Sequence, residues 1–321
     1  MHDGRVRSGR TRRTNGTRLV AETYDRWSRP MASLLATRRV LPALLALPLA
    51  GTVLFAAPVS ASPPPGHAVQ AAPAIAVAAD LTATIRLSNC SAALVRYPSS
   101  LSTDRAMMLT NGHCFEGGFL AAGQVITNRT STRRGTLLSS AGSAVATLTA
   151  DRVLYATMTG TDVTLYRLTS TFAAIQSATG ISARTISASH PVTGDTFVPS
   201  GFFARVFDCD IQTFVPTLRE DAWTWHDSIR YNTACATVHG TSGSPIVNTG
   251  TGEIVGINNT ANDNGGRCTL NNPCEVSPTG VITATQGLRY GQETYWFTTC
   301  LTASRTINLN QAGCLLTRPG G

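Results

Sequence analysis

The stretch from Gly240 to Pro245 reads Gly-Thr-Ser-Gly-Ser-Pro, and it places Ser242 among small residues just before an apolar pair, Ile246-Val247. Glycine on either side of a serine allows a tight backbone turn. In such a turn the N–H groups of Gly240 and Ser242 can point into one small space and stabilise a developing oxyanion. These residues could therefore supply the nucleophile and the anion site of an acyl transfer, although a plain Gly/Ser turn between strands has a similar sequence.

A serine hydroxyl is a weak nucleophile at neutral pH and needs an imidazole as general base, itself oriented by a carboxylate. Both groups lie upstream. His113 follows an apolar run, residues 106–111, in a Gly-His-Cys step, and Asp162 precedes a strand-like alternation that begins at Val163. Taken singly, His113 could be a turn residue and Asp162 a strand cap. Together with Ser242 they offer all three groups that the chemistry requires.

The order His, Asp, Ser with these flanking motifs resembles the trypsin/chymotrypsin-like serine peptidases, over roughly residues 90–288. The resemblance implies a nucleophilic Ser242, a general base and acid at His113, and an Asp162 that fixes the imidazole tautomer. It also implies that the N–H groups of Gly240 and Ser242 form the oxyanion hole. Neither a cofactor nor a metal is expected, and the substrate would be an extended polypeptide.

Two features depart from the animal trypsins. The residue before the nucleophile is Thr241 where those enzymes carry an acid, and the chain contains no Ile-Val-Gly-Gly sequence that could be released. The chain therefore cannot use the ion pair between that acid and a new amino terminus. It looks more like the secreted bacterial branch that includes the glutamyl and lysyl endopeptidases. The run from His190 to Asp195 is loosely similar to a His-Pro-x-Gly-Asp turn of that branch.

Substrate preference is expected to depend on Ala236, Thr237, His239 and Asn258. Counting back from the nucleophile places Ala236 and Thr237 at the floor of the pocket, with no acid there. An arginine or lysine side chain would then lose its hydration without gaining a partner. Thr237 and His239 favour glutamate before the scissile bond, whereas Asn258, neutral where glutamyl endopeptidases place a histidine, opposes it. The sequence ranks an uncharged side chain first and glutamate second.

The elements that must hold these residues are short strands. Residues 79–315 show no long amphipathic helix but many β-branched or alternating runs separated by Gly, Asn, Ser and Thr, which predicts an all-β barrel or sandwich protein. The resemblance implies two six-stranded antiparallel β-barrels with the active site in the cleft between them. We assign residues 80–185 to the N-terminal barrel and 186–321 to the C-terminal barrel with a disulfide-closed tail.

The beginning of the chain has the pattern of a targeting segment. A long apolar stretch, residues 40–59, follows two arginines and ends at a small-residue cleavage motif, so residues 1–61 are interpreted as a signal segment of a secreted protein. A membrane anchor is the alternative, because the stretch is long enough to span. Residues 62–79 form an Ala/Pro-rich linker or short pro-segment. Met31 is a second candidate start, and a weak twin-arginine match leaves the export route open.

Charge and cysteine content narrow the function classes. Ten of the 26 basic residues and three of the 18 acidic residues lie in 1–61, which leaves 16 basic and 15 acidic residues and no case for binding nucleic acid.

All eight cysteines follow the signal segment, which predicts disulfides in an exported chain. The resemblance implies Cys90–Cys114. For the rest we expect sequential pairs: Cys209–Cys235, Cys268–Cys274 and Cys300–Cys314. A Cys/His zinc site is disfavoured because no Cys-x-x-Cys pair occurs.

The sequence therefore predicts a secreted, monomeric serine endopeptidase that acts through an acyl-enzyme and has no stable membrane association after signal cleavage. A catalytically silent binding module on the same fold is the alternative from another class, and a glutamyl-specific endopeptidase is the narrower alternative within the family. An α/β-hydrolase esterase is disfavoured, because the histidine precedes the serine and Gly-x-Ser-Gly-Ser differs from Gly-x-Ser-x-Gly.

Overall fold

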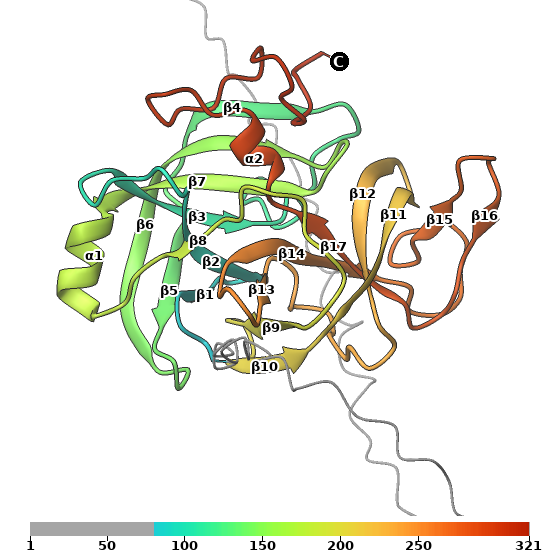
Figure 1. Ribbon diagram of the computed structural model, residues 1–321, viewed down its shortest axis with the longest axis horizontal. Coiled ribbons are helices and arrows are strands. Elements are labelled where there is room, and N and C mark those ends of the chain that lie inside the picture. Colours follow the sequence, from blue (N-terminus) through green and yellow to red (C-terminus); the bar gives the residue numbers. More distant parts are fainter. Residues whose placement is uncertain (1–79, 321) are drawn as a thin grey trace, which may run out of the picture. The chain divides into compact units, whose positions relative to one another are not determined.

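The computed structural model describes residues 80–320, which form two β-barrels and a C-terminal tail that returns over the first barrel (Figure 1). The first half of the chain contains β1 (Thr84–Arg86), β2 (Ser91–Arg96), β3 (Arg105–Thr110), β4 (Val125–Thr130), β5 (Arg134–Leu138), β6 (Ala144–Thr157), β7 (Val163–Thr171), α1 (Phe172–Thr179) and β8 (Arg184–Thr185). The second half contains β9 (Thr196–Ser200), β10 (Arg205–Asp208), β11 (Ile211–Glu220), β12 (Trp223–Tyr231), β13 (Pro245–Asn248), β14 (Ile254–Ala261), β15 (Cys274–Val276), β16 (Ile282–Thr283), β17 (Arg289–Glu293) and α2 (Trp296–Thr299).

The first barrel is closed by six antiparallel strands in the order β1-β5-β6-β7-β3-β2, with β2 pairing back to β1. The long strand β6 bends, so that its first half pairs with β5 and its second half with β4. Strand β2 is buried along almost its whole length, as expected for a strand inside a closed and covered barrel. The short β8 adds to β2 in the parallel direction.

The second barrel follows the order β9-β13-β14-β17-β12-β11, and β10, β15 and β16 extend the sheet at its margins. It closes through Gly194 and Ile211, which exchange two backbone hydrogen bonds of 3.1 and 3.0 Å between the start of β9 and the start of β11. The predicted fold, two antiparallel six-stranded barrels of the chymotrypsin-like kind, is confirmed.

Strand β12 joins the two barrels at the level of the candidate site. The indole N–H of Trp225 donates to the carbonyl of Met158 at 2.8 Å, and that of Trp223 donates to the carbonyl of Leu120 at 2.9 Å. Gly160 also exchanges backbone hydrogen bonds with β12 through Thr224 and His226. Because the loop that contains Gly160 leads directly into Asp162, these contacts place the acid against the second barrel.

The C-terminal tail is fixed to the first barrel. After α2, the tail carries Arg305, which forms a bidentate ion pair with Asp104, and Thr317, whose carbonyl accepts a hydrogen bond from the hydroxyl of Tyr155 at 2.9 Å. In Figure 1 the tail lies across the strands of this barrel. Phe297 of α2 packs edge-on against Tyr155.

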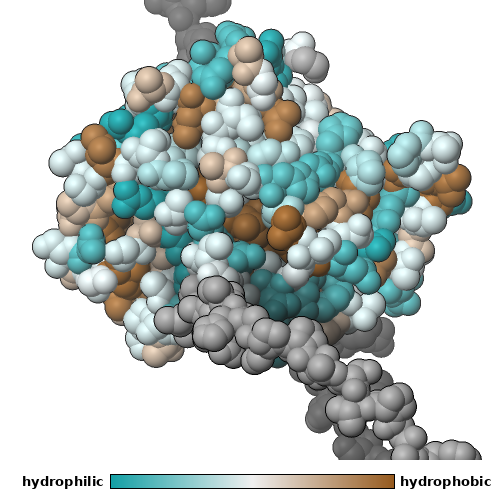
Figure 2. Space-filling model, in the orientation of Figure 1, coloured by the Kyte–Doolittle hydropathy of each residue, from teal (hydrophilic) through white to brown (hydrophobic). Residues whose placement is uncertain are grey.

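All four predicted disulfides are confirmed: Cys90–Cys114, Cys209–Cys235, Cys268–Cys274 and Cys300–Cys314. The first joins the start of β2 to the residue after His113. Residues 80–320 contain no helix that is both long and apolar enough to cross a membrane. On the face drawn in Figure 2, hydrophobic residues are scattered among polar ones. The predicted signal segment, residues 1–61, and linker, residues 62–79, lie outside the described residues.

Candidate active site

His113 and Asp162 are brought together at one end of the first barrel. Strands β3 and β7 pair antiparallel with Thr110 opposite Thr164, so the residues just after β3 lie beside those just before β7. The Oδ2 atom of Asp162 lies 2.7 Å from Nδ1 of His113, and Oδ1 accepts the backbone N–H of His113 at 2.9 Å. This end of the barrel therefore holds an imidazole whose ring and backbone are both bound to one carboxylate.

Gly112 makes this approach possible. A Cβ atom at this position would lie 2.0 Å from the carbonyl oxygen of Thr157 and 2.8 Å from Oδ1 of Asp162. Any larger residue would push the histidine segment away from the carboxylate. Asn111, also buried, donates its amide N–H to the backbone carbonyl of Asp162 at 2.9 Å and fixes the same pair of segments.

The two members of this pair differ in exposure. The Asp162 side chain is fully buried, whereas His113 keeps 19 % of its side chain exposed. Burial alone lowers the pKa of His113, but the charge and hydrogen bond of Asp162, with a further contribution from Glu220, outweigh it and raise the pKa above its ordinary value. The carboxylate thus favours the imidazolium that a general base becomes after it accepts a proton.

Ser242 approaches from the second barrel. Its carbonyl accepts the backbone N–H of Ser91 at 2.8 Å, and the next N–H, that of Gly243, donates to the carbonyl of Asn258 at 2.9 Å. Ser91 is adjacent to Cys90, which the disulfide joins to Cys114 beside the histidine. The serine segment and the histidine segment are therefore attached to the same short stretch of β2.

The hydroxyl of Ser242 donates to the carbonyl of Asn259 at 3.1 Å rather than to His113. The structure thus contains the acid–histidine hydrogen bond but not the serine–histidine one. Rotation about the Ser242 side chain redirects the hydroxyl, and such contacts are often loose without substrate. Asn259, just downstream in β14, is itself buried.

The backbone around Ser242 has the form of an anion site. Gly240 and Gly243 have φ angles of 93° and 77°, which glycine adopts without strain. Among the described residues, the N–H groups of Gly240 and Ser242 donate to no protein acceptor, whereas the intervening N–H of Thr241 donates to Val238. Two free N–H groups beside a hydroxyl are what an oxyanion hole requires.

Residues 99–257, a span that includes His113, Asp162 and Ser242, match the family model of the trypsin-like peptidase domain. The chain carries a trypsin-like peptidase domain. Solved structures similar to it include the MamO protease domain of Magnetospirillum magneticum, with 15 % identity, a TM-score of 0.39 and coverage of 67 % of this chain and 93 % of that one. Nocardiopsis protease has 16 % identity and a TM-score of 0.37, with 67 % and 92 % covered. No curated protein matches the chain.

Thr241 precedes Ser242 at the position where animal trypsins carry an acid. Thr241 is buried, its hydroxyl donates to the carbonyl of Val238 at 2.5 Å, and it accepts the amide N–H of Asn258 at 3.0 Å. The amide of Asn258 thus connects β14 to the loop that carries Ser242. Neutral hydrogen bonds hold the loop where an ion pair does so in animal trypsins.

The other residues predicted to line the substrate pocket differ in exposure. Thr237 is buried, Ala236 is exposed, and His239 lies at the surface, where its Nε2 is 2.6 Å from Oδ2 of Asp263. The partner of His239 is thus a carboxylate of the protein itself. Glu220, which the sequence analysis did not single out, is buried and accepts hydrogen bonds from the hydroxyl of Thr260 and the backbone of the 271 loop.

Arg289 is the residue that sequence reasoning missed. It begins β17 opposite Ala261, two residues beyond the Asn259 carbonyl that holds the Ser242 hydroxyl. Its Nε donates to the carbonyl of Thr237 at 2.7 Å, and Nη1 donates to the carbonyl of Gly287 at 2.8 Å. It has no carboxylate partner among the described residues, and Nη2 makes no hydrogen bond with them. No local motif marks this arginine.

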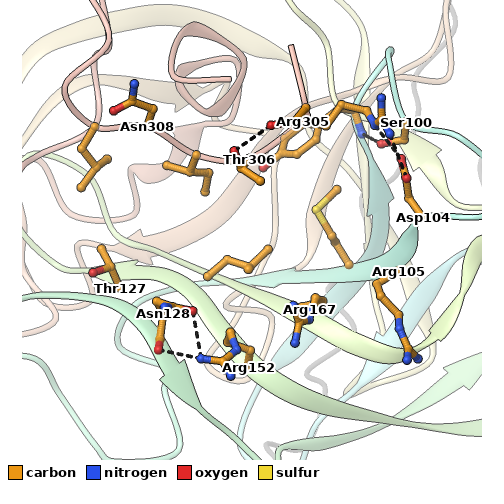
Figure 3. Close-up of a pocket in the computed structure, with 16 residues that line it drawn as sticks. Ser100, Asp104, Arg105, Thr127, Asn128, Arg152, Arg167, Arg305, Thr306 and Asn308 are labelled. Carbon is orange, nitrogen blue, oxygen red and sulfur yellow. Dashed lines mark hydrogen bonds and ion pairs between the residues drawn. The ribbon is translucent and has the colours of Figure 1, made fainter. Parts of the chain in front are cut away.

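A cavity of about 670 Å³ lies away from this site, between the first barrel and the C-terminal tail, and none of the three candidate catalytic residues lines it (Figure 3). Three of its four arginines are bound to neighbouring groups: Arg305 pairs with Asp104, and Arg152 donates to Asn128. Arg167 forms a two-bond pair with Asp151. Of these contacts, the pair of Arg305 with Asp104 joins the tail to the first barrel, and the other two lie within the barrel.

Proposed function

We propose that this protein is a secreted serine endopeptidase in which Ser242, His113 and Asp162 act as a catalytic triad. The observation that carries the proposal is the two-point contact between Asp162 and His113. Ser242, whose own N–H and that of Gly240 are unpaired among the described residues, is bonded through Ser91 to the segment that the Cys90–Cys114 disulfide joins to the histidine. A buried carboxylate fixed to one nitrogen of an imidazole leaves the other nitrogen available as a base. The four disulfides support secretion, because such bonds persist in oxidising compartments.

The reaction would proceed through an acyl-enzyme. The Ser242 hydroxyl turns from Asn259 to His113, loses its proton to the free imidazole nitrogen and attacks the scissile carbonyl. The resulting oxyanion is bound by the N–H groups of Gly240 and Ser242, and His113 returns the proton to the departing amine. Water then enters, gives its proton to His113 and attacks the ester carbonyl. His113 passes that proton to the departing Oγ of Ser242 as the acid product is released. Asp162 stabilises the imidazolium in both halves.

The extended substrate would add to β14. Strand β13 pairs with β14 only as far as Pro245 opposite Ile257, while β17 continues to pair with β14 up to Ala261. The last residues of β14 therefore have a strand neighbour on one side only, next to Ser242. A polypeptide can complete this sheet by main-chain hydrogen bonds, which suits an endopeptidase that accepts long substrates.

Arg289 favours an acidic side chain before the scissile bond. Its guanidinium lies against the carbonyl of Thr237, in the segment that leads to the nucleophile, and retains unused N–H donors. A substrate carboxylate would supply the ionised acceptor that the protein itself does not provide, whereas a substrate arginine or lysine would be repelled. This observation supports a preference that differs from the order expected from the sequence, with glutamate or aspartate ahead of an uncharged side chain.

Matched peptides that differ only at the residue before the scissile bond test both the peptidase activity and the preference for an acidic side chain. Substrates with Glu, Asp, Ala or Arg should be cleaved with kcat/KM highest for the acids. In the Arg289→Gln variant, kcat/KM for acidic substrates should fall by between about 10-fold and 100-fold, which corresponds to the free energy of one hydrogen bond to a charged group. The kcat/KM for the Ala substrate should change little. Arg267→Gln is the matched control, because Arg267 also donates to a main-chain carbonyl but lies in another loop.

The outcomes separate the two claims. Cleavage that favours Ala and is unaffected by Arg289→Gln would contradict the acidic preference while leaving the peptidase proposal intact. No cleavage of any peptide, by protein with intact disulfides, would contradict the peptidase proposal and favour the silent binding module.

A further inference from the structure

A cluster of three ligand-type side chains lies on the second barrel, apart from the triad. His190 comes from the connection that precedes β9, Asp227 from the middle of β12, and Glu293 from the end of β17. The Nε2 atom of His190 lies 3.1 Å from Oδ2 of Asp227 and 3.1 Å from Oε1 of Glu293. One atom from each residue therefore faces the same small space, and all three atoms lie within 4.8 Å of one another.

The tautomer of His190 is defined by its other nitrogen. Nδ1 lies 2.6 Å from the carbonyl oxygen of Pro191, and because a carbonyl can only accept, Nδ1 carries the proton. In a neutral imidazole the Nε2 lone pair then points at two carboxylate oxygens. A histidine that donates Nδ1–H to a backbone carbonyl and presents Nε2 is the usual arrangement of a metal-bound imidazole.

Glu293 provides the second, independent observation. Its side chain is completely buried, yet among the described residues neither of its oxygens accepts a hydrogen bond of acceptable geometry. A buried carboxylate beside a second carboxylate and a lone pair needs a positive charge between them.

We propose that His190, Asp227 and Glu293 bind a divalent transition-metal cation of the zinc type. Zinc bonds of about 2.0 Å to nitrogen and oxygen place neighbouring donors of a tetrahedron roughly 3.3 Å apart, close to the separations between His190 and the two carboxylates. One imidazole and two carboxylates are ligands that this ion accepts. His190 and Asp227 keep part of their side chains exposed, which leaves a side open for a water ligand.

The metal would connect three segments that are distant in the sequence. The connection between the barrels would be attached through His190 to two strands of the second barrel. The imidazole is already held between Phe214, at a centroid distance of 4.5 Å, and Tyr295, at 5.4 Å, so the ligand geometry needs little rearrangement. We therefore assign the ion a structural role in fixing the connection, distinct from the chemistry at Ser242.

This site modifies the expectation, drawn from the sequence, that the protein holds no metal. That expectation came with the family resemblance, and the cysteines argued only against a Cys/His site; all of them are in disulfides. The His-Pro turn at His190 was visible in the sequence, but its two carboxylate neighbours follow it at long and irregular spacing. Only the pairing of β12 with β17 brings them to the same place.

Zinc binding by the exported protein tests the proposal. The Ser242→Ala background prevents self-cleavage, and the protein is freed of metal with a chelator before titration with Zn²⁺ by calorimetry. We expect one zinc ion per chain and a rise in Tm with added zinc. Glu293→Gln, which keeps the shape but not the charge, should weaken zinc binding by at least about 100-fold and abolish the rise in Tm. Asp151→Asn removes a carboxylate from an ion pair on the first barrel and should change neither result.

His190→Gln and Asp227→Asn serve as second variants if Glu293→Gln fails to fold, because both side chains are partly exposed. The proposal is overturned if no saturable zinc binding occurs, or if binding is equally strong in the variants. Binding of Ca²⁺ but not of zinc would also overturn it, because Ca²⁺ takes oxygen ligands and would not use the imidazole of His190.

Discussion

Asp162 binds His113 at two points, with Oδ2 2.7 Å from Nδ1 of the ring and Oδ1 2.9 Å from the backbone nitrogen. The carboxylate therefore fixes the position of the histidine segment as well as the orientation and tautomer of its ring. Since Nδ1 must carry the proton that lies between the two groups, Nε2 remains as the base. The proposed triad follows from this contact more than from any other.

Replacing Asp162 by Asn should lower kcat by about four orders of magnitude while the protein still folds. The amide is isosteric, but it can present an N–H to the ring and so favour the wrong tautomer. Steady-state hydrolysis of a peptide ester or amide measures the effect, with circular dichroism to verify the fold. A loss smaller than tenfold would show that Asp162 has only a structural role.

The pH dependence of kcat/KM should report the raised pKa of His113. Burial lowers this pKa, but the charge and hydrogen bond of Asp162 raise it further, so the net direction is upward. The protonated ring cannot act as a base, and therefore the acid limb should have its midpoint above the ordinary histidine value of about 6.5. A profile measured from pH 5 to 9 with a midpoint below that value would contradict the assignment.

Gly243→Ala should destabilise the protein and abolish activity, because an added Cβ would lie 2.1 Å from Oγ1 of Thr110 and 2.2 Å from the carbonyl of Ser91. Gly280→Ala is the matched control. Gly280 has a similar φ of 81°, but nothing lies within 4 Å of the added atom. The control should lower the free energy of unfolding by the backbone strain alone, about 1 kcal/mol, whereas Gly243→Ala should lower it several times more. Equal losses in urea unfolding would show that the first barrel does not press against the nucleophile loop.

Activity should not require a newly formed, buried amino terminus. The Thr241 hydroxyl is already bonded to Val238 and Asn258, so no charge before Ser242 awaits an ammonium partner. Proteins beginning at Ser62, at Leu81, or with a short extension should hydrolyse substrate at similar rates. Activity restricted to one defined terminus, and lost on adding a single residue, would be incompatible with this account.

The fold could be predicted, and a candidate triad named, because local patterns mark the residues involved. His113, Asp162 and Ser242 each stand at the end of a strand or in a glycine turn, and these short motifs are visible in the sequence. The disulfides followed because neighbouring cysteines in the sequence also meet in space.

The remaining features depend on pairing between distant strands, which no local pattern shows. Arg289 reaches Thr237 only because β17 pairs with β14, and Glu220 reaches Thr260 by a comparable route. Asn258 was predicted to contact substrate because it aligns with a pocket residue of the glutamyl endopeptidases. The structure adds that its amide N–H donates to the hydroxyl of Thr241, a contact between β14 and the Ser242 loop that no local pattern shows.

Labelling by a sulfonyl fluoride tests the proposed triad most directly, because the reagent reacts with a serine only when a base activates it and an anion site receives its oxygen. Intact-mass measurement of the exported protein should show one label per chain, and peptide mapping should place it on Ser242. Loss of peptide hydrolysis should follow the same time course, and Ser242→Ala should take up none. Stoichiometric labelling that persists in Ser242→Ala, or hydrolysis that survives full labelling, would contradict the account.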